Sequence, residues 1–274
     1  MNISYHAWKA YKECPRKYYL KFFRKTEPTR PDNNYFKLYG LLMEKFFEMF
    51  SNKWRFKTPY MPPDFIRKKL RVLYDNILEM NDVDWYGRFV KLGKEDIFEQ
   101  ALHDVQEIMN SENHNLFLNT KSEVAIEVKT KDGVTLSARI DFIHKNLDNS
   151  VLILDGKGAN KVKKNVSDDQ LMFYALLYYL HTSKIPERLA FFYYRFNLVA
   201  PVPYDINTLN EFRARVSKDV KDIINMESFK ARPSTKACKF CPYNNSCPDK
   251  TKWQAKKKKS SIEKDAIGIV NLGF

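Results

Sequence analysis

Residues 151–157 read Val-Leu-Ile-Leu-Asp-Gly-Lys, a short apolar run that ends in an acid, a glycine and a lysine. An apolar run of this length after the turn-forming stretch 146–150 predicts a buried strand. Side chains two positions apart lie on the same face of a strand. We therefore expect Asp155 and Lys157 to project together from the end of this strand, and the rest of the fold is predicted outward from them.

A β-hairpin is expected just before this strand. Residues 123–129 and 134–143 are strand-like, and Lys131-Asp132-Gly133 between them is a strong turn signal. Asp141 falls near the end of the second of these segments. Because neighbouring strands lie side by side in a sheet, its carboxylate is expected to approach that of Asp155.

A helix is expected just after the strand. Ser167, followed by two acids and Gln170, is typical of a helix N-terminus, and the aromatic, Leu-rich pattern continues to about His181. Gln170 and Tyr174 lie one turn apart on one face of this helix. From that face they could hold Lys157 or a backbone phosphate.

The remaining periodicity completes a mixed α/β order of helices, three strands, a helix, a strand and a helix. Two short helices are expected to start at Ser4 and Pro15. Further helices are expected near 35–50, 64–80, 94–109 and 207–226, and a further strand at 189–196.

The expected meeting of acids and a lysine carries chemistry. Two neighbouring carboxylates repel unless a hard cation lies between them, and Mg²⁺ or Mn²⁺ prefers such oxygen ligands. Lys157 would stabilise charge on a phosphate or orient an attacking water, as metal-assisted phosphodiester hydrolysis requires. Taken singly, each residue has a plainer interpretation: Asp141 as a turn residue, Lys157 as a solvated strand end, and Gln170 with Tyr174 as a surface pair.

The chain has four cysteines, Cys14 near its start and Cys238, Cys241 and Cys247 in the spacing C-x2-C-x5-C. The start has no apolar leader, so we expect a reducing, cytoplasmic location, where clustered thiols more often bind metal than form disulfides. Four thiolates around one centre would tie the two chain ends together. Zinc sites usually pair two short-spaced couples, so zinc fits this spacing awkwardly and stays an alternative, as do a disulfide pair and free thiols.

The charge of the chain suits a polyanion. The formal net charge is +14, and seven Lys against three acids in residues 248–274 contribute only +4 of it. Nucleic acid is the commonest partner of such a basic body. With 44% hydrophobic residues the chain is expected to be globular, and no apolar run approaches the roughly 20 residues that span a membrane.

The ordered set Asp141, Asp155-Gly156-Lys157 and Gln170-x3-Tyr174 resembles the motifs of RecB-like PD-(D/E)xK nucleases. The opening 4–19 resembles the segment before this core in members that carry an iron–sulfur cluster, where one cysteine precedes the nuclease motifs and three follow. Such members include CRISPR-adaptation nucleases, AddB-type helicase–nuclease subunits and exonuclease V. There are two departures: Glu44 stands four residues after Gly40, where members often carry a His, and no Pro precedes Asp141.

The resemblance implies an α/β fold: a restriction-endonuclease-like core with a helical insertion and a C-terminal Cys-rich iron–sulfur module. It implies that Mg²⁺ or Mn²⁺ is held by Glu44, Asp141, Asp155 and the carbonyl of Gly156. The implied catalytic set is Asp141, Asp155, Lys157, Gln170 and Tyr174. A [4Fe–4S] cluster would be held by Cys14, Cys238, Cys241 and Cys247, and Cys241-Pro242 resembles the Cys-Pro found at such clusters.

We therefore expect a DNA nuclease, an exonuclease on ends or flaps of single-stranded DNA. Repair, recombination, CRISPR adaptation and phage DNA processing stay open as the process that it serves. The sequence contains no G-x4-G-K-[ST] motif, so unwinding would come from a helicase or another DNA-processing partner. No membrane partner is expected. One alternative is a non-catalytic DNA-binding or scaffolding subunit with a structural metal centre, and another is a zinc-bearing nucleic-acid-binding module.

The expected domain organisation has five segments. Residues 1–51 hold the N-terminal helices with the first cysteine and Glu44, 52–118 form a helical lobe, and 119–230 form the nuclease core. Residues 231–250 form the cysteine module and 251–274 a basic tail.

Overall fold

The computed structural model describes residues 1–28, 35–54, 61–80, 93–159, 161–162 and 167–234, together with Cys238, 241–245, Cys247 and Asp249. Its chain contacts define two compact units. The first comprises Met1–Tyr5 and Asn33–Lys221, and the second His6–Asp32 and Asp222–Phe274. The predicted tail 251–274 lies outside the described residues, and the predicted five-segment division stays a prediction.

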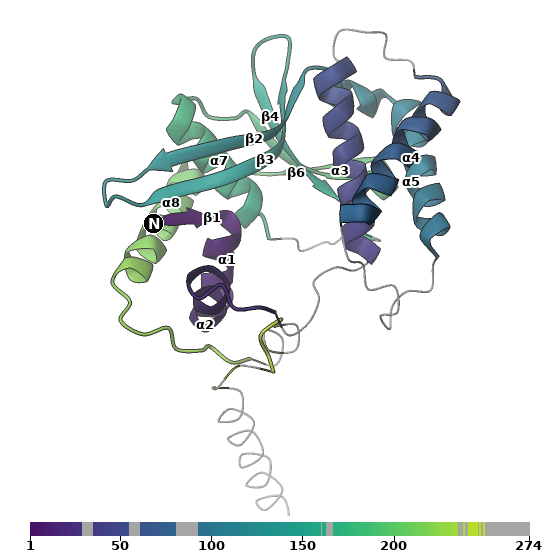
Figure 1. The fold of residues 1–274 in the computed structure, drawn as a ribbon. Helices are drawn as coiled ribbons and strands as arrows, with labels where there is room; N and C mark the ends of the chain where they lie inside the picture. The colour runs from purple at the N-terminus through teal and green to yellow at the C-terminus, as the bar shows by residue number, and fades with distance from the viewer. Residues whose placement is uncertain are drawn as a thin grey trace, which may run out of the picture. The chain divides into compact units, whose positions relative to one another are not determined.

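The first unit is built on a mixed sheet with the order β1-β3-β4-β5-β6, to which β2 adds by pairing with β3 (Figure 1). The strands are β1 (Asn2–Ser4), β2 (Thr120–Lys129), β3 (Thr135–Lys145), β4 (Val151–Lys157), β5 (Arg188–Tyr193) and β6 (Leu198–Val202). The predicted hairpin is present as β2 and β3. Gly133 adopts a φ of 73° in its turn, a conformation that glycine takes without the steric cost of a side chain.

The strand β3 changes its neighbour along one edge. Its start pairs in parallel with β1, ending at Ser4↔Ser137, and its end pairs antiparallel with β4, beginning at Phe142↔Leu154. The other edge pairs with β2 from Thr120↔His144 to Lys129↔Thr135. Asp141 thus lies between the part of β3 that pairs with β1 and the part that pairs with β4.

Helices cover both faces of the sheet. Phe142, Leu154 and Phe192 join one apolar core with α3 (Tyr35–Trp54), α4 (Pro63–Met80) and α5 (Lys94–Met109). Phe191 points the other way, because the Lys157 ammonium lies over its ring and also contacts α7 (Asp169–Thr182). Side chains alternate between faces along a strand, so α3 and α7 lie on opposite faces.

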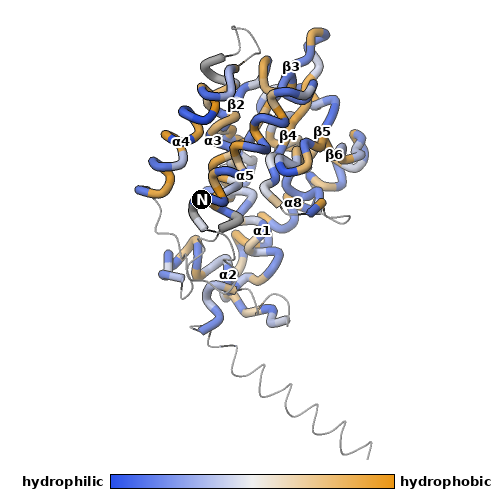
Figure 2. The backbone as a smooth tube through the Cα atoms, turned by 90° about the vertical axis from the view of Figure 1, so that its right-hand side faces the viewer, coloured by the Kyte–Doolittle hydropathy of each residue, from blue (hydrophilic) through white to orange (hydrophobic). Residues whose placement is uncertain are grey.

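The helical lobe follows its sequence pattern closely. The predicted helices 64–80 and 94–109 are α4 and α5, and apolar and polar residues alternate along α4 in Figure 2. Paired Arg67–Glu99 and Arg71–Glu95 contacts of 2.7–3.1 Å join the two helices on their exposed side. Burial of the apolar stripe in the shared core, rather than these exposed pairs, accounts for the stability of the lobe.

The sequence missed two short strands. The predicted strand 189–196 ends at Tyr193, and a 3₁₀ turn at Tyr194–Phe196 then leads into β6. Asn197 takes a left-handed φ of 43°, which reverses the chain so that β6 pairs back on β5. The other missed strand, β1, is only 3 residues long, too short for a periodic pattern.

The second unit begins with α1 (Tyr5–Glu13), α2 (Pro15–Tyr18) and the π-helical turn η1 (Tyr19–Phe23). Pro15 occupies the first turn of α2, where its missing N–H breaks no helical hydrogen bond. Among the described residues the last long helix is α8 (Ile206–Ile224), which carries the chain from the first unit into the second. The predicted helix starts at Ser4 and Pro15 are thus within one residue of the observed ones.

A close backbone approach holds α3 against the end of β4. A Cβ atom added to Gly158 would lie 2.9 Å from the Cα of Gly40 and 3.0 Å from the Tyr39 ring. Glu44 follows Gly40 by one helical turn. The absence of side chains at this contact therefore determines how far the Glu44 carboxylate stands from the sheet.

We predict that Gly158→Ala destabilises the protein by about 1–3 kcal/mol, as overpacking does, because the new methyl group meets backbone atoms that cannot rotate away. Urea-induced unfolding measures this change. The matched control is Gly40→Ala on the other side of the same contact, whose added Cβ would meet only the Cα of Gly158 at an ordinary 4.0 Å. Equal stabilities of the two variants would contradict the close packing of α3.

Candidate active site

Asp141 and Asp155 meet where β3 and β4 separate. The Gly156 N–H donates a hydrogen bond of 3.0 Å to Oδ2 of Asp141. Asp155 is 1% exposed, and its carboxylate forms an ion pair with the Lys157 ammonium. The expected meeting of the acids with the lysine is therefore present, with the backbone of Gly156 between the two carboxylates.

Lys157 is held from α7 by the residues that the sequence placed there. Its Nζ donates to Oε1 of Gln170 at 3.2 Å, and Nε2 of Gln170 donates to the Tyr174 hydroxyl at 2.9 Å. These contacts form a chain from Tyr174 through Gln170 and Lys157 to Asp155. The ammonium is thereby fixed beside the acidic pair rather than free to swing into solvent.

Three carboxylates from separate elements converge next to this chain. Ligand oxygens of Glu44, Glu123 and Asp141 all lie within 4.8 Å of one another. Glu44 comes from α3, Glu123 from β2 and Asp141 from β3. Oxygen donors at such spacing suit a hard divalent cation. Glu44 thus takes part in a cluster that fits a metal, whereas Asp155 lies outside this trio and is paired with Lys157.

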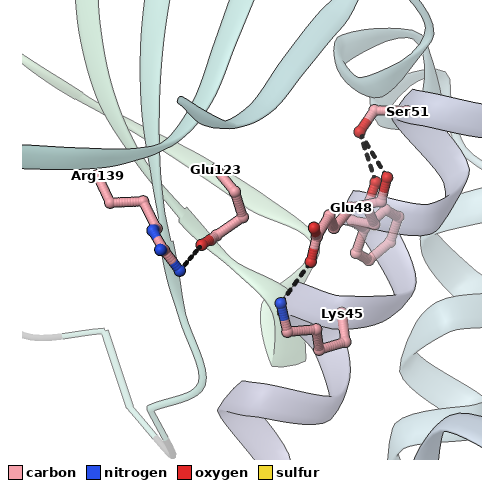
Figure 3. Close-up of polar contacts among 6 residues, drawn as sticks. Lys45, Glu48, Ser51, Glu123 and Arg139 are labelled. Carbon is pink, nitrogen blue, oxygen red and sulfur yellow. Dashed lines mark hydrogen bonds and ion pairs between the residues drawn. The ribbon is translucent and has the colours of Figure 1, made fainter. Parts of the chain in front are cut away.

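Glu123 is the member of this cluster that the sequence did not indicate. It has a φ of 53°, which side-chain-bearing residues rarely adopt, and backbone strain of this kind gathers at functional sites. Figure 3 shows its carboxylate turned toward the Arg139 guanidinium, which reaches it from the neighbouring strand at 3.3 Å. On α3, Lys45 pairs with Glu48 at 2.5 Å. The alternation of side chains over residues 123–129 does not predict this left-handed backbone angle. Only the structure therefore identifies Glu123 as a member of the carboxylate cluster.

Tyr194 lines the site from the 3₁₀ turn that follows β5. It is fully buried, and its hydroxyl would stand 2.1 Å from a Cβ added to Gly156. Burial raises the pKa of Tyr194, and the nearby charges of Asp141, Glu44 and Asp155 raise it further. Tyr194 is therefore a neutral hydroxyl beside the carboxylates, and glycine is required at position 156.

The protonation of the acids reflects their crowding. Burial, together with a hydrogen bond that protonated Glu44 donates to Glu123 and the charge of Asp141, raises the pKa of Glu44 to about 9. Burial, followed by the charge of Asp155, raises the pKa of Asp141 well above its usual range. Buried like charges resist simultaneous ionisation, so the cluster holds protons that a cation would displace.

A separate thiol site lies within the second unit. Cys14, Cys238, Cys241 and Cys247 all line one cavity of about 40 Å³. The Arg232 N–H donates to Sγ of Cys14 at 3.4 Å. Burial raises the pKa of Cys241, and the nearby Cys14 and Cys247 add to that rise. The fold thus brings the lone N-terminal cysteine to the C-terminal trio, and sulfur donors of this kind suit zinc or an iron–sulfur cluster.

The chain belongs to the PD-(D/E)XK nuclease superfamily, whose sequence pattern it matches over residues 2–248. This agrees with the mixed sheet, with Asp155 and Lys157 at the end of β4, and with Asp141 on β3. No curated protein matches the chain. One solved structure, that of the protein SSO0001, is similar to it with 14% sequence identity and a TM-score of 0.33, over 88% of this chain and 94% of that one.

Members of this superfamily are nucleases that act on DNA and typically use Mg²⁺ or Mn²⁺, as the acidic cluster would accommodate. Among the described residues, no helix combines the length and apolar character needed to cross a membrane.

We predict that the metal-free protein loses stability as the pH rises from about 4.5 to about 9, the ordinary and folded pKa values of Glu44. The folded state binds this proton more tightly than the unfolded chain, so its stabilising effect is present at low pH and is lost on deprotonation. Added Mg²⁺ should raise the melting temperature more at high pH than at low pH.

The matched variants are Glu44→Gln, which removes the repelling charge, and Glu127→Gln, which alters an exposed acid of the same β2 strand. Glu44→Gln should flatten the pH dependence of the melting temperature and reduce its response to Mg²⁺. A Glu44→Gln profile that overlays the wild-type profile would show that Glu44 does not carry the effect.

Proposed function

We propose that the protein is a divalent-metal-dependent exonuclease that hydrolyses phosphodiester bonds at the ends of single-stranded DNA. The observation that carries the proposal is the chain Tyr174–Gln170–Lys157–Asp155 beside the converging carboxylates. It supplies oxygen ligands for a cation and a positioned ammonium in one place, as hydrolysis of a phosphodiester needs.

Glu44, Glu123 and Asp141 would hold Mg²⁺ or Mn²⁺, with Asp155 and the Gly156 carbonyl as further ligands from the adjacent strand. The bound cation supplies Lewis acidity toward a phosphoryl oxygen. Asp155 orients the Lys157 ammonium, and Gln170 holds it on the other side. Lys157 in this position would stabilise negative charge on the phosphate through a charge-assisted hydrogen bond.

The basic character of the chain supports a polyanionic substrate, with a net charge of +14. A non-catalytic DNA-binding or scaffolding subunit is the second candidate, since basic surfaces also serve binding alone. The two differ in whether the acids and the lysine turn over substrate. A helicase partner in repair or recombination would fit the nuclease.

We predict that Asp155→Asn or Lys157→Met lowers the rate of Mn²⁺-dependent cleavage by about 100-fold or more, while binding of a single-stranded oligonucleotide persists. End-labelled linear and circular single-stranded DNA are the substrates, and Asp148→Asn, in an exposed turn, is the control. Cleavage of the circle would exclude a strict exonuclease. Wild-type activity in the Asp155 variant would refute this active-site assignment, and binding without metal-dependent cleavage by the wild-type protein would favour the binding-subunit candidate.

We further propose that the four cysteines hold a [4Fe–4S] cluster with a structural role. The cavity that all four share and the N–H donated to Cys14 support this, because hydrogen bonds to sulfur are characteristic of iron–sulfur sites. The cluster would join the N-terminal helices of the second unit to its C-terminal segment. Zinc is the alternative occupant of the same donor set.

Anaerobically purified protein is expected to contain about four iron and four sulfide per chain and to absorb broadly near roughly 400 nm. Cys14→Ala should lower both contents and the melting temperature, because the remote ligand closes the longest loop. Stoichiometric zinc in a colourless protein would overturn the iron–sulfur assignment and leave the nuclease proposal to its own test.

A further inference from the structure

We infer that the second unit carries a base-stacking platform for single-stranded nucleic acid, formed by Tyr19, Phe23 and Phe229. This inference deepens the proposed function, on which it rests, by naming the surface that holds the single strand. The platform is argued within the second unit alone.

The three rings form one compact aromatic cluster. The Tyr19 and Phe229 centroids are 5.0 Å apart at an interplanar angle of 20°, and the Tyr19 and Phe23 centroids are 5.9 Å apart at 22°. The Phe23 and Phe229 centroids are 5.8 Å apart, and these two rings are tilted by 42°. The separations fall within the range of favourable aromatic pairs, so Tyr19 stacks on each of the other rings and holds them in an ordered cluster.

The π-helical turn aligns two of these rings. The Arg24 N–H donates to the Tyr19 carbonyl at 2.9 Å, five residues back along the chain. The wider turn brings Tyr19 and Phe23 to one side of η1. Such turns are rare and often mark functional sites, and here the turn creates the stack.

One ring of the cluster remains open to solvent. Phe23 is 55% exposed, whereas the neighbouring Tyr18, which packs against Phe22 and Phe229, is 2% exposed. Tyr18 therefore belongs to the local core, and burial does not explain why an aromatic residue stands at position 23. An exposed ring held in an ordered cluster offers its free surface to another flat ring.

The charge around the stack is complementary to a phosphate backbone. Residues 15–25 contain five Lys or Arg and no acidic residue. Two of these cations are paired, Arg16 with Asp249 at 3.6 Å and Lys17 with Glu13 at 2.5 Å. The others, Lys21, Arg24 and Lys25, are exposed, as is Lys230 next to Phe229 in the sequence. Aromatic rings interleaved with cations are the combination by which proteins hold single strands without sequence preference. Flat stacked rings favour bases over lipid chains, so we commit to nucleic acid.

The test measures binding of a fluorescent oligothymidine and of a duplex of equal length, by polarisation without added divalent cation. Phe23→Leu keeps an apolar side chain but removes the π-face, and it should weaken single-strand binding about five-fold or more, with a smaller effect on the duplex. Phe23→Trp should restore binding. Val72→Ala, at a side chain 53% exposed on α4, controls for loss of exposed apolar surface.

A second readout identifies the contact directly. Oligonucleotides with 5-iodouracil should crosslink on irradiation to Tyr19 or Phe23, mapped by mass spectrometry. Lys21→Ala should weaken single strand and duplex alike and reduce the salt dependence of binding by about one ion, whereas Phe23→Leu should leave that dependence unchanged.

Three results would overturn the platform: wild-type single-strand affinity in Phe23→Leu, equal losses for single strand and duplex, or Phe23-dependent binding to anionic lipid vesicles without Phe23-dependent oligonucleotide binding. These outcomes are separable from the nuclease test. Phe23-dependent binding without cleavage would refute the nuclease and keep the platform. Cleavage by a Phe23→Leu variant that binds single strands with unchanged affinity would refute the platform and keep the nuclease.

Discussion

The mutual repulsion of buried carboxylates is the constraint on which the first unit depends. Glu44, Glu123 and Asp141 are held within 4.8 Å of one another by three different elements, and in the absence of a cation this proximity is unfavourable unless protons are retained. The surrounding fold must therefore impose the arrangement. It does so between the part of β3 that pairs with β1 and the part that pairs with β4. There the edge of β3 leaves room for the Asp141 side chain and the Gly156 N–H.

Close packing supplies the rigidity that this arrangement needs. Gly158 lets the backbone of α3 approach the chain that follows β4, and Gly156 leaves room for the buried Tyr194 hydroxyl. Interiors packed at this density respond to an added methyl group by displacing their neighbours. Two glycines thus set the position of Glu44 and of the strand end that carries Asp155 and Lys157.

The second unit is organised differently, around sulfur donors and aromatic rings. The cavity lined by all four cysteines joins residues from both ends of the chain, and the Tyr19–Phe229 stack makes a second connection between the same two segments. Long-range connections of this kind constrain the unfolded chain most strongly. The unit thus combines a metal-binding donor set with an exposed aromatic surface, and each has its own physical basis.

The sequence by itself determined the features that depend on local spacing. The strand end with Asp155 and Lys157, the helix face with Gln170 and Tyr174, the hairpin before them and the amphipathic α4 and α5 all follow from periods of two or 3.6 residues. Tertiary structure alone decided the rest. Glu123 enters the carboxylate cluster through a left-handed backbone angle. A second left-handed angle, at Asn197, reverses the chain so that β6 pairs with β5. Tyr194 reaches the acids because β5 ends before it and a 3₁₀ turn follows. Each depends on contacts between segments distant in the chain, which no local period encodes.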